Sequence, residues 1–430
     1  MKKLLLVLIF LNLLLPQLIF SQLSISGDIT PTGMFRLSDA SLIDLPFRLG
    51  NINVRYSFGD FELVTSTALE TRWKDPEFTA ESFQFREAYL NWYPSFGEVR
   101  LGKIIQAWGA ADANNPTDNL SPYDFYYMFM AGSDRKNGSL AGIAKMYLGD
   151  WQAEISLMPD HTPNRLPYNE PDFPIALPPE PTPEQFVKVE NPLEFGIRLR
   201  RAFNMADLSI SYLKSHDQMF NVFALEGTSP NLSPIYGYRN TNVLGMDGVL
   251  FPGNWTLRGE AAYFMTNNPY TDQTSIVFEV DAQYLQYVLQ VEYELANQVQ
   301  IMAQLIGTDI LKAEGRTLLM GPTGVPGVSL LDETNFQLGM GTPFAMISDR
   351  VIIFSSMVTL FDNALDLSGM LMVNLEETGY MTNLSSSYAI REGLKLDATL
   401  AYFIGGDEEG NSFRELEDFS NLSMGLTYSF

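Results

Sequence analysis

Segments of about ten residues in which apolar and polar side chains alternate recur along the whole chain. Residues 194–200, for example, place Phe195, Ile197 and Leu199 on one parity and charged residues on the other. Successive side chains on a strand point to opposite faces, so each segment predicts a strand with one apolar and one polar face. The other segments with this pattern are 61–73, 151–157, 208–212, 255–261, 299–305, 365–373 and 394–402.

An apolar face on nearly every strand is what contact with lipid requires. After residue 22 no stretch approaches the roughly 20 apolar residues of a spanning helix, and the longest candidate, 351–361, contains two serines and a threonine. A chain that spans a membrane without helices must form a closed barrel. We therefore predict an all-β fold, a single transmembrane antiparallel β-barrel of about 18 strands within a range of roughly 16 to 20.

The connections between these segments fall into short turns and long loops, which in such barrels lie at opposite ends. The predicted long loops include 109–138, 160–192, 215–240, 308–333 and 405–418. Counting segments gives about 19 strands, whereas a single-chain bacterial barrel has an even number. The surplus strand is expected between Thr308 and Arg350, where successive predicted strands no longer alternate in direction across the membrane.

The N-terminal residues predict export. Lys2 and Lys3 precede a mostly apolar run that Pro16 interrupts, and Ser21 is a small residue at a plausible cleavage point. This pattern is typical of a secretory signal peptide, so the predicted organisation is a signal peptide over 1–21 and a barrel over 22–430. The absence of cysteine excludes disulfides and thiolate metal sites.

The last strand carries a further signal. The apolar residues at its alternate positions, which share one face, are Leu422, Met424, Leu426, Tyr428 and the terminal Phe430. This ending resembles the closing strand of bacterial outer-membrane barrels, in which such a run is read by the barrel-assembly machinery. The resemblance implies that these five residues are an assembly signal and that the assembly machinery is a partner.

Charge constrains partners and the interior. Without Lys2 and Lys3 the 27 basic residues fall to 25 against 51 acids, a net charge of −26 that argues against nucleic acid as a partner. Outer-membrane lipid and lipopolysaccharide remain expected partners. Charges on the polar parity are predicted to line the lumen, namely Arg72, Arg100, Arg198, Arg200, Arg258, Glu194 and Glu260. They would either line a wet passage or pair with one another and fill a closed barrel.

A motif runs from Arg100 through Trp108-Gly109-Ala110-Ala111-Asp112 to Pro122-Tyr123-Asp124. It resembles the R-x-G…W-G-x-A-D…P-x-D stretch of a large, uncharacterised family of outer-membrane barrels found near hydrophobe-transport components. The resemblance covers about 80–200 and the last 70 residues, and it implies a barrel without specifying a substrate.

The residues after this motif are too apolar for a solvated loop. We predict that Trp108 lies near a membrane–water interface, which tryptophan favours, and that 123–130 folds into the barrel mouth. The candidate constriction residues are Trp108, Tyr123, Phe125, Tyr126 and Phe129. Packing on the rim for structural reasons is the alternative.

Catalytic and metal sites have little support. His161 and His216 belong to no recognisable catalytic motif, so no enzyme and no cofactor are predicted. Asp112, Asn114 and Asp118 have oxygen ligands at spacings compatible with Ca²⁺, but these residues are also ordinary turn formers.

Together these features predict an integral outer-membrane protein of a diderm bacterium that passes small solutes through its lumen. A conduit for hydrophobic compounds is the alternative within transport. A surface adhesin or scaffold with a closed barrel is the alternative from another class.

Overall fold

The computed structural model describes residues 22–430 apart from 75–78, 80–81, 113, 176, 178–179, 229–230, 273–274, 296–298, 321–325, 344–347 and 409–410. The predicted signal peptide, 1–21, lies outside the described residues. Within the described part, no helix is both long and apolar enough to cross a membrane.

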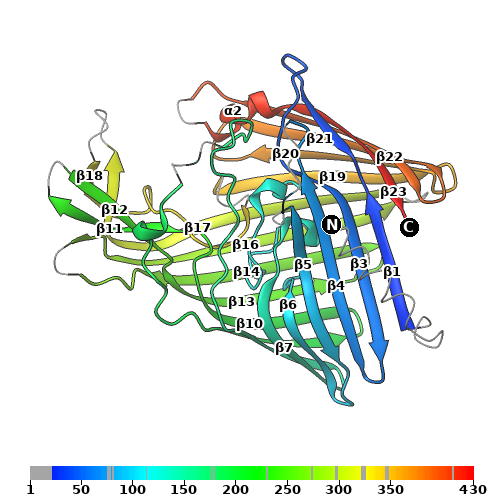
Figure 1. Cartoon of the computed structure of the whole chain (residues 1–430), viewed down its shortest axis with the longest axis horizontal. Helices are drawn as coiled ribbons and strands as arrows, with labels where there is room; N and C mark the ends of the chain where they lie inside the picture. The colour runs from blue at the N-terminus through cyan, green and yellow to red at the C-terminus, as the bar shows by residue number, and fades with distance from the viewer. Residues whose placement is uncertain are drawn as a thin grey trace.

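The chain folds into a closed antiparallel barrel of 18 strands, as predicted (Figure 1). Each strand pairs with its neighbours in the wall, and β23 returns to pair with the first strand. Closure leaves no strand edge unpaired, which a bilayer would not tolerate. The wall consists of β1 (Leu23–Ile29) with β2 (Thr32–Arg36), β3 (Phe47–Phe58), β4 (Phe61–Thr71), β5 (Phe83–Trp92), β6 (Gly97–Ile104), β7 (Ser139–Leu148), β8 (Trp151–Met158), β9 (Glu194–Phe203), β10 (Ala206–His216), β13 (Asn240–Leu250), β14 (Trp255–Asn267), β16 (Val280–Leu295), β17 (Val299–Met320), β19 (Arg350–Leu360), β20 (Leu365–Asn374), β21 (Gly379–Arg391), β22 (Leu394–Gly405) and β23 (Asn421–Ser429).

The first wall strand is interrupted. β1 and β2 pair one after the other with β23, and Pro31 separates them. Proline has no backbone N–H to donate, so it breaks the ladder at this point. At the other end of the seam, Gly27 and Phe430 exchange two backbone hydrogen bonds of 3.0 Å, which close the barrel between the two ends of the described chain.

The predicted alternation is confirmed on the wall. The apolar residues of β23 point outward and are solvent-exposed in the isolated molecule, and in 194–200 Ile197 is exposed while Phe195 and Leu199 are half-buried. Aromatic rings collect beside the short turns, where Phe58 stacks on Phe61 and Phe61 on Trp92. Such a girdle is typical of the membrane interface of a barrel.

Within the described residues, seven short connections, the start of β1 and the end of β23 lie at one end of the barrel, and the long connections lie at the other (Figure 1). Gly59 and Gly149 have φ near +60° in tight turns, a conformation that glycine adopts without strain. By analogy with such barrels, the short turns face the periplasm and the long loops face the exterior.

The surplus strand lies where the sequence placed it. β17 continues beyond the wall and pairs with β18 (Pro326–Leu330) in a hairpin that does not span. The prediction of a loop over 308–333 was therefore partly wrong, because an amphipathic strand can extend beyond the membrane-spanning wall. The predicted loop 215–240 also contains strands, β11 (Asn221–Thr228) and β12 (Asn231–Gly237), which form a small external sheet with β15 (Ile276–Val277). A short helix, α2 (Ser412–Glu415), covers the same end of the barrel near β21 and β22.

Candidate channel lumen

The connection between β6 and β7, residues 105–138, folds into the barrel rather than outward. Trp108 is only 2% exposed and donates from Nε1 to Glu154 Oε1 on β8 at 2.7 Å. Its ring lies over Gly196 of β9, where an added Cβ would come within 2.8 Å of the indole. The prediction that Trp108 sits near a membrane interface was therefore wrong, because a buried carboxylate inside the barrel takes its N–H.

Glu260 of β14 anchors the same loop. Its Oε1 accepts hydrogen bonds from the backbone N–H groups of Ala110 and Ala111, both at 2.5 Å, and from Asn115 Nδ2 at 3.0 Å. Its Oε2 accepts one from Thr117 Oγ1 at 2.8 Å. Four donors are therefore directed at one buried carboxyl group.

The Trp-Gly pair of the motif has a physical explanation here. Gly109 has φ of +108°, and a Cβ at this position would lie 2.6 Å from Glu260 Oε1. Glycine both adopts that backbone conformation and leaves room for the carboxylate. The motif therefore encodes the docking of the loop onto Glu260.

Amides of β16 and β17 extend this docking surface. Gln290 exchanges two hydrogen bonds with Asp112, at 3.0 and 2.9 Å. Gln304 accepts from Asn114 Nδ2 at 3.1 Å and donates to the carbonyl of Asp112 at 2.8 Å. The segment 110–117 is thus fixed to three wall strands by side chains that point inward.

The calcium hypothesis gains no support from this arrangement. Asp112 is held by Gln290, and Asn114 donates to Gln304. Asp118 accepts from the backbone N–H of Trp108 at 3.2 Å and lies 3.3 Å from Lys136 Nζ. Asp112 and Asp118 therefore have protein partners of their own, and the Ca²⁺ site stays a prediction.

The apolar residues 123–130 lie at the mouth. Tyr123, Phe125 and Met128 are buried in a cluster with Phe173 of the next long loop. Phe129 packs against this cluster and also contacts Phe403 and Phe419, with ring centroids 6.0 and 6.1 Å apart. The predicted constriction residues at the mouth therefore lie together, whereas Trp108 lies apart on β8 and β9.

Arginines tie this mouth cluster together. Arg165 lies 2.6 Å from Glu70 and 3.1 Å from Asp124. Arg72 pairs with Glu170, which also accepts from Tyr126 Oη at 2.9 Å. Arg72, predicted as a pore-wall charge, is therefore a mouth residue held by a loop acid.

The electrostatics of the mouth follow from burial. Asp124 is fully buried, and its burial raises the pKa of its carboxyl although Arg165 opposes that rise. Burial also disfavours ionisation of Asp172, but the N–H of Asp44 and the guanidinium of Arg36 lower the pKa of its carboxyl. Asp172 thus stays ionised and pairs with Arg36 at 2.7 Å. Together with the N–H of Asp44, this pair links the connection between β2 and β3 to the connection between β8 and β9.

Replacing Arg165 with methionine is expected to loosen the mouth. Glu70 and Asp124 would keep their burial but lose a shared cation, which costs about 3 kcal/mol for a broken buried pair. Hydrogen exchange over 123–130 should then accelerate by about two orders of magnitude. Arg200→Met is the matched control, because the Arg200–Asp207 pair is more exposed. Equal exchange in the two variants would contradict this role for Arg165.

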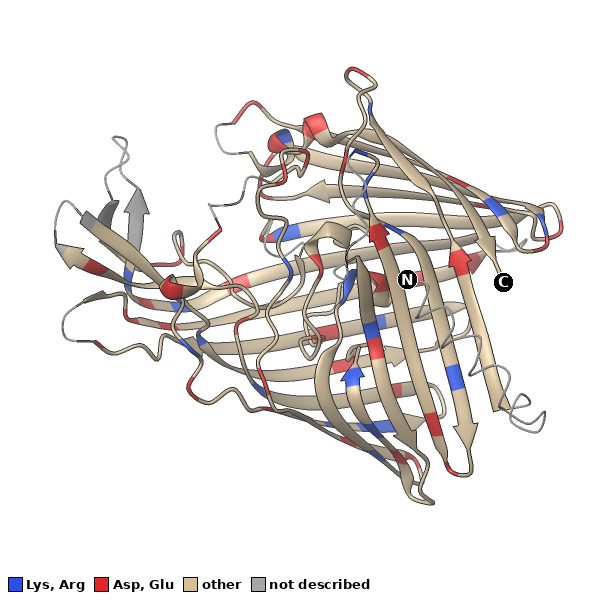
Figure 2. Ribbon diagram, in the orientation of Figure 1, with Lys and Arg blue, Asp and Glu red and all other residues tan. Residues whose placement is uncertain are grey.

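Figure 2 shows basic and acidic residues distributed along the wall strands. The other predicted wall charges lie on inward parities, and each has a partner. Arg100 pairs with Glu98 at 2.5 Å, Arg198 with Asp247 at 2.7 Å, and Arg258 with Glu292 at 2.6 Å. Glu194 lies at the exterior end of β9, between His161 and His216. The paired charges concentrate on the side that the inward loop covers.

The lumen beside the later strands is partly filled, because Ile353, Phe403 and Phe419 belong to a buried apolar cluster at the exterior end of the barrel, near α2. A cavity of about 810 Å³ extends from the short-turn end, at residues 251–256, to Phe129 and Arg135 of the inward loop. Its polar lining includes Asp112, Glu292 and Gln304. Its apolar lining comes from the inward parity of the later strands, where Met302, Ile353, Met370 and Met381 lie.

Sequence alternation did not predict this apolar inner face. It predicts a polar inward face for the later strands, whose outward positions are occupied by leucines. The signal was present, because Met370 and Met372 occupy the parity of Asp366 and Ser368 in the same strand.

The closed barrel, its apolar outer band and its inward loop define the class of protein. The chain is an integral β-barrel of the outer membrane, with the architecture of Gram-negative porins. No protein-family model and no curated protein matches it.

Solved structures share the fold at low sequence identity. The outer membrane protein opdK of Pseudomonas aeruginosa has a TM-score of 0.53 and 8% identity, covering 95% of this chain and 99% of its own. OccK11 (OpdR) of the same organism has a TM-score of 0.52 and 12% identity, covering 95% and 96%. OccK2 (OpdF) of that organism, in complex with glucuronate, has a TM-score of 0.52 and 10% identity, covering 95% and 98%.

Proposed function

We propose that this protein is an outer-membrane channel that passes small solutes through the part of its lumen beside the later strands. The observation that carries this proposal is the cavity of about 810 Å³ between the inward loop and the wall. Its volume lies within the roughly 300 to 1,000 Å³ of sites that hold small molecules. OccK2, a barrel of similar fold, was solved with glucuronate, a small organic acid.

The charges of the cavity favour cations over such an acid. Asp112, Glu292 and Glu294 line it, and Arg135 is the basic residue among its described lining. Arg258 lies beside it but is neutralised by Glu292. An acidic surplus in a low-dielectric passage raises the local concentration of cations.

The direct test is reconstitution of the mature barrel in planar bilayers. Discrete current steps are expected, since the cavity begins at the short-turn end and reaches the inward loop at Phe129 and Arg135. A protein that inserts and resists heat-induced unfolding in detergent, yet gives no steps, would favour the adhesin or scaffold alternative.

Reversal potentials in a salt gradient should indicate a preference for cations of a few-fold, below the roughly tenfold enrichment of strongly focused fields. Salt screens this preference, so it should weaken at high ionic strength. Glu294→Gln removes a charge that lines the cavity and should reduce the preference, whereas Glu279→Gln, at the exterior end of the barrel, should not. Anion selectivity in the unchanged protein would contradict the assigned passage.

A conduit for hydrophobic compounds is a second candidate, and the apolar inner face favours it. Met302, Ile353 and Met370 line the cavity, with Met302 beside Glu292 in the β16–β17 ladder, and methionine adapts to apolar ligands of varied shape. Met370→Gln should slow the uptake of an apolar probe into proteoliposomes while leaving ion conductance nearly unchanged. If probe uptake and ion conductance fall together, the apolar inner face serves the passage of all solutes rather than of apolar solutes.

A further inference from the structure

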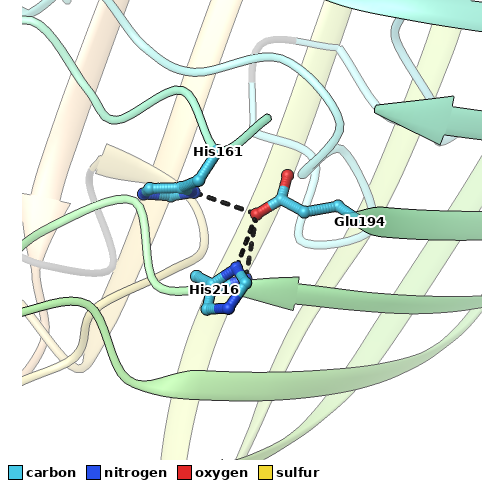
Figure 3. A group of neighbouring side chains, drawn as sticks. All are labelled: His161, Glu194 and His216. Atoms are coloured by element: carbon cyan, nitrogen blue, oxygen red, sulfur yellow. Dashed lines mark hydrogen bonds and ion pairs between the residues drawn. The ribbon is translucent and has the colours of Figure 1, made fainter. Parts of the chain in front are cut away.

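The two histidines of the chain, His161 and His216, meet on one carboxylate. His161 Nδ1 lies 2.9 Å from Glu194 Oε1, and His216 Nδ1 lies 3.1 Å from the same oxygen. Figure 3 shows both rings approaching this oxygen while the second carboxylate oxygen points away. The three donor atoms lie within 4.8 Å of one another, close enough for one ion to contact all three after small side-chain rotations.

We propose that His161, Glu194 and His216 bind one divalent transition-metal ion of the Zn²⁺ class. Imidazole nitrogen and carboxylate oxygen are ordinary ligands of Zn²⁺, Ni²⁺ and Cu²⁺, whereas Ca²⁺ and Mg²⁺ prefer oxygen alone. Two histidines and one acid occupy three positions of a tetrahedral site and leave the fourth for water.

The surroundings suit a metal site. All three side chains are less than a tenth exposed, so the ion would be shielded from bulk water. Small cavities of about 270 and 280 Å³ reach His216 and His161 respectively and offer room for a water ligand and a path of entry. Tyr238 packs on His161 with ring centroids 4.6 Å apart and restricts its orientation.

A hydrogen-bonded cluster without a metal ion explains the arrangement of His161, Glu194 and His216 less completely. His161 Nε2 is buried and has no hydrogen-bond partner among the described residues, so that contact network uses only one nitrogen of the ring. Both Nδ1 atoms compete for one oxygen, although each ring could have bonded a separate acceptor. Convergence of the only two imidazoles on one acid, from positions 55 residues apart, is what a metal site requires.

The position gives the ion a mechanical role. His161 lies near the start of the connection between β8 and β9, Glu194 lies at its end, and His216 ends the adjacent strand β10. An ion here would clip together both ends of the loop that contributes Arg165, Asp172 and Phe173 to the mouth. Metal binding would therefore order the exterior loops, and it does not require that solutes pass through the lumen.

The test uses the full barrel in detergent, purified without a histidine tag and stripped with a chelator. Zn²⁺ is titrated against a chromophoric chelator in excess Mg²⁺, which suppresses weak binding to the many surface acids. One Zn²⁺ per chain is expected. His161→Asn and His216→Asn should each weaken binding by more than about 100-fold, since loss of an outer-shell partner alone costs roughly 10- to 100-fold.

Co²⁺ provides an independent readout, because its visible absorption reports nitrogen and oxygen coordination. The bands should appear with the unchanged protein and disappear in Glu194→Gln. Tyr238→Phe is the matched control, since it keeps the aromatic packing on His161 and should bind both ions normally. Heat-dependent migration in gels verifies that each variant is a folded barrel.

Three outcomes would overturn the site. These are no saturable Zn²⁺ binding by the folded, unchanged protein, equal binding by a folded variant that lacks both histidines, or displacement of Zn²⁺ by excess Mg²⁺.

Discussion

The Glu260→Ala variant is expected to release residues 110–117 from the wall and to conduct more current per channel than the unchanged protein. Glu260 receives four hydrogen bonds from this segment, and alanine can accept none of them. Each of these hydrogen bonds contributes roughly 0.5 to 1.5 kcal/mol, so we expect about 3 kcal/mol in total. The fraction of time that the loop is detached should rise by about 100-fold.

Single-channel recording and limited proteolysis measure the two consequences. Conductance and its noise should increase, and cleavage within 110–117 should become detectable in the folded barrel. Glu260→Gln is the matched isostere, because its amide keeps one accepting oxygen for Ala110 and Ala111 and can donate to Thr117. Asp207→Ala controls for loss of an inward acid, since Asp207 pairs with Arg200 and not with the loop. Unchanged conductance together with unchanged protection in Glu260→Ala would mean that Gln290, Gln304 and Trp108 hold the loop without it.

Deleting Phe430 is expected to lower the amount of folded barrel in the outer membrane by at least about tenfold. The residue combines two features, the outward aromatic ring of the predicted assembly signal and two backbone hydrogen bonds to Gly27. Loss of those bonds alone costs about 1 to 3 kcal/mol, because neutral hydrogen bonds contribute roughly 0.5 to 1.5 kcal/mol each. That is small beside the stability of a closed barrel, so a large effect in cells must arise during assembly.

Refolding of purified chains in detergent separates the two contributions. The deletion variant should fold in detergent with nearly normal yield while failing to accumulate in cells. Phe430→Trp keeps a terminal aromatic residue and should accumulate normally. Equal failure in detergent and in cells would assign the effect to closure of the seam, and normal accumulation of the deletion variant would contradict the assembly signal.

The barrel itself was predictable because the bilayer imposes a simple code. One apolar parity per strand, as in 194–200, identifies both the strand and its outward face, and no soluble core competes for those residues. The strand count was uncertain only at β17 and β18, because a hairpin that leaves the membrane keeps the same local alternation. The alternation alone does not indicate where the bilayer ends.

The lumen was predictable only in part. Parity placed Arg100, Arg198 and Arg258 on the inside, and the structure places them there. Parity could not indicate that Trp108 and Gly109 dock on Glu260, which lies some 150 residues away in the sequence. The meeting of His161, Glu194 and His216 has the same origin, since contacts between distant segments depend on barrel closure rather than on local pattern. The functions assigned to these residues remain predictions.

Because the inward loop is fastened to β8, β14, β16 and β17, the free cross-section is a crescent displaced from the barrel axis. A molecule inside this cavity contacts about one third of the wall strands, and Arg100 and Arg198 are not among the residues that line it. Substitutions of the few methionines and acids that line this cavity would therefore change which solutes enter it, without altering the rest of the barrel wall.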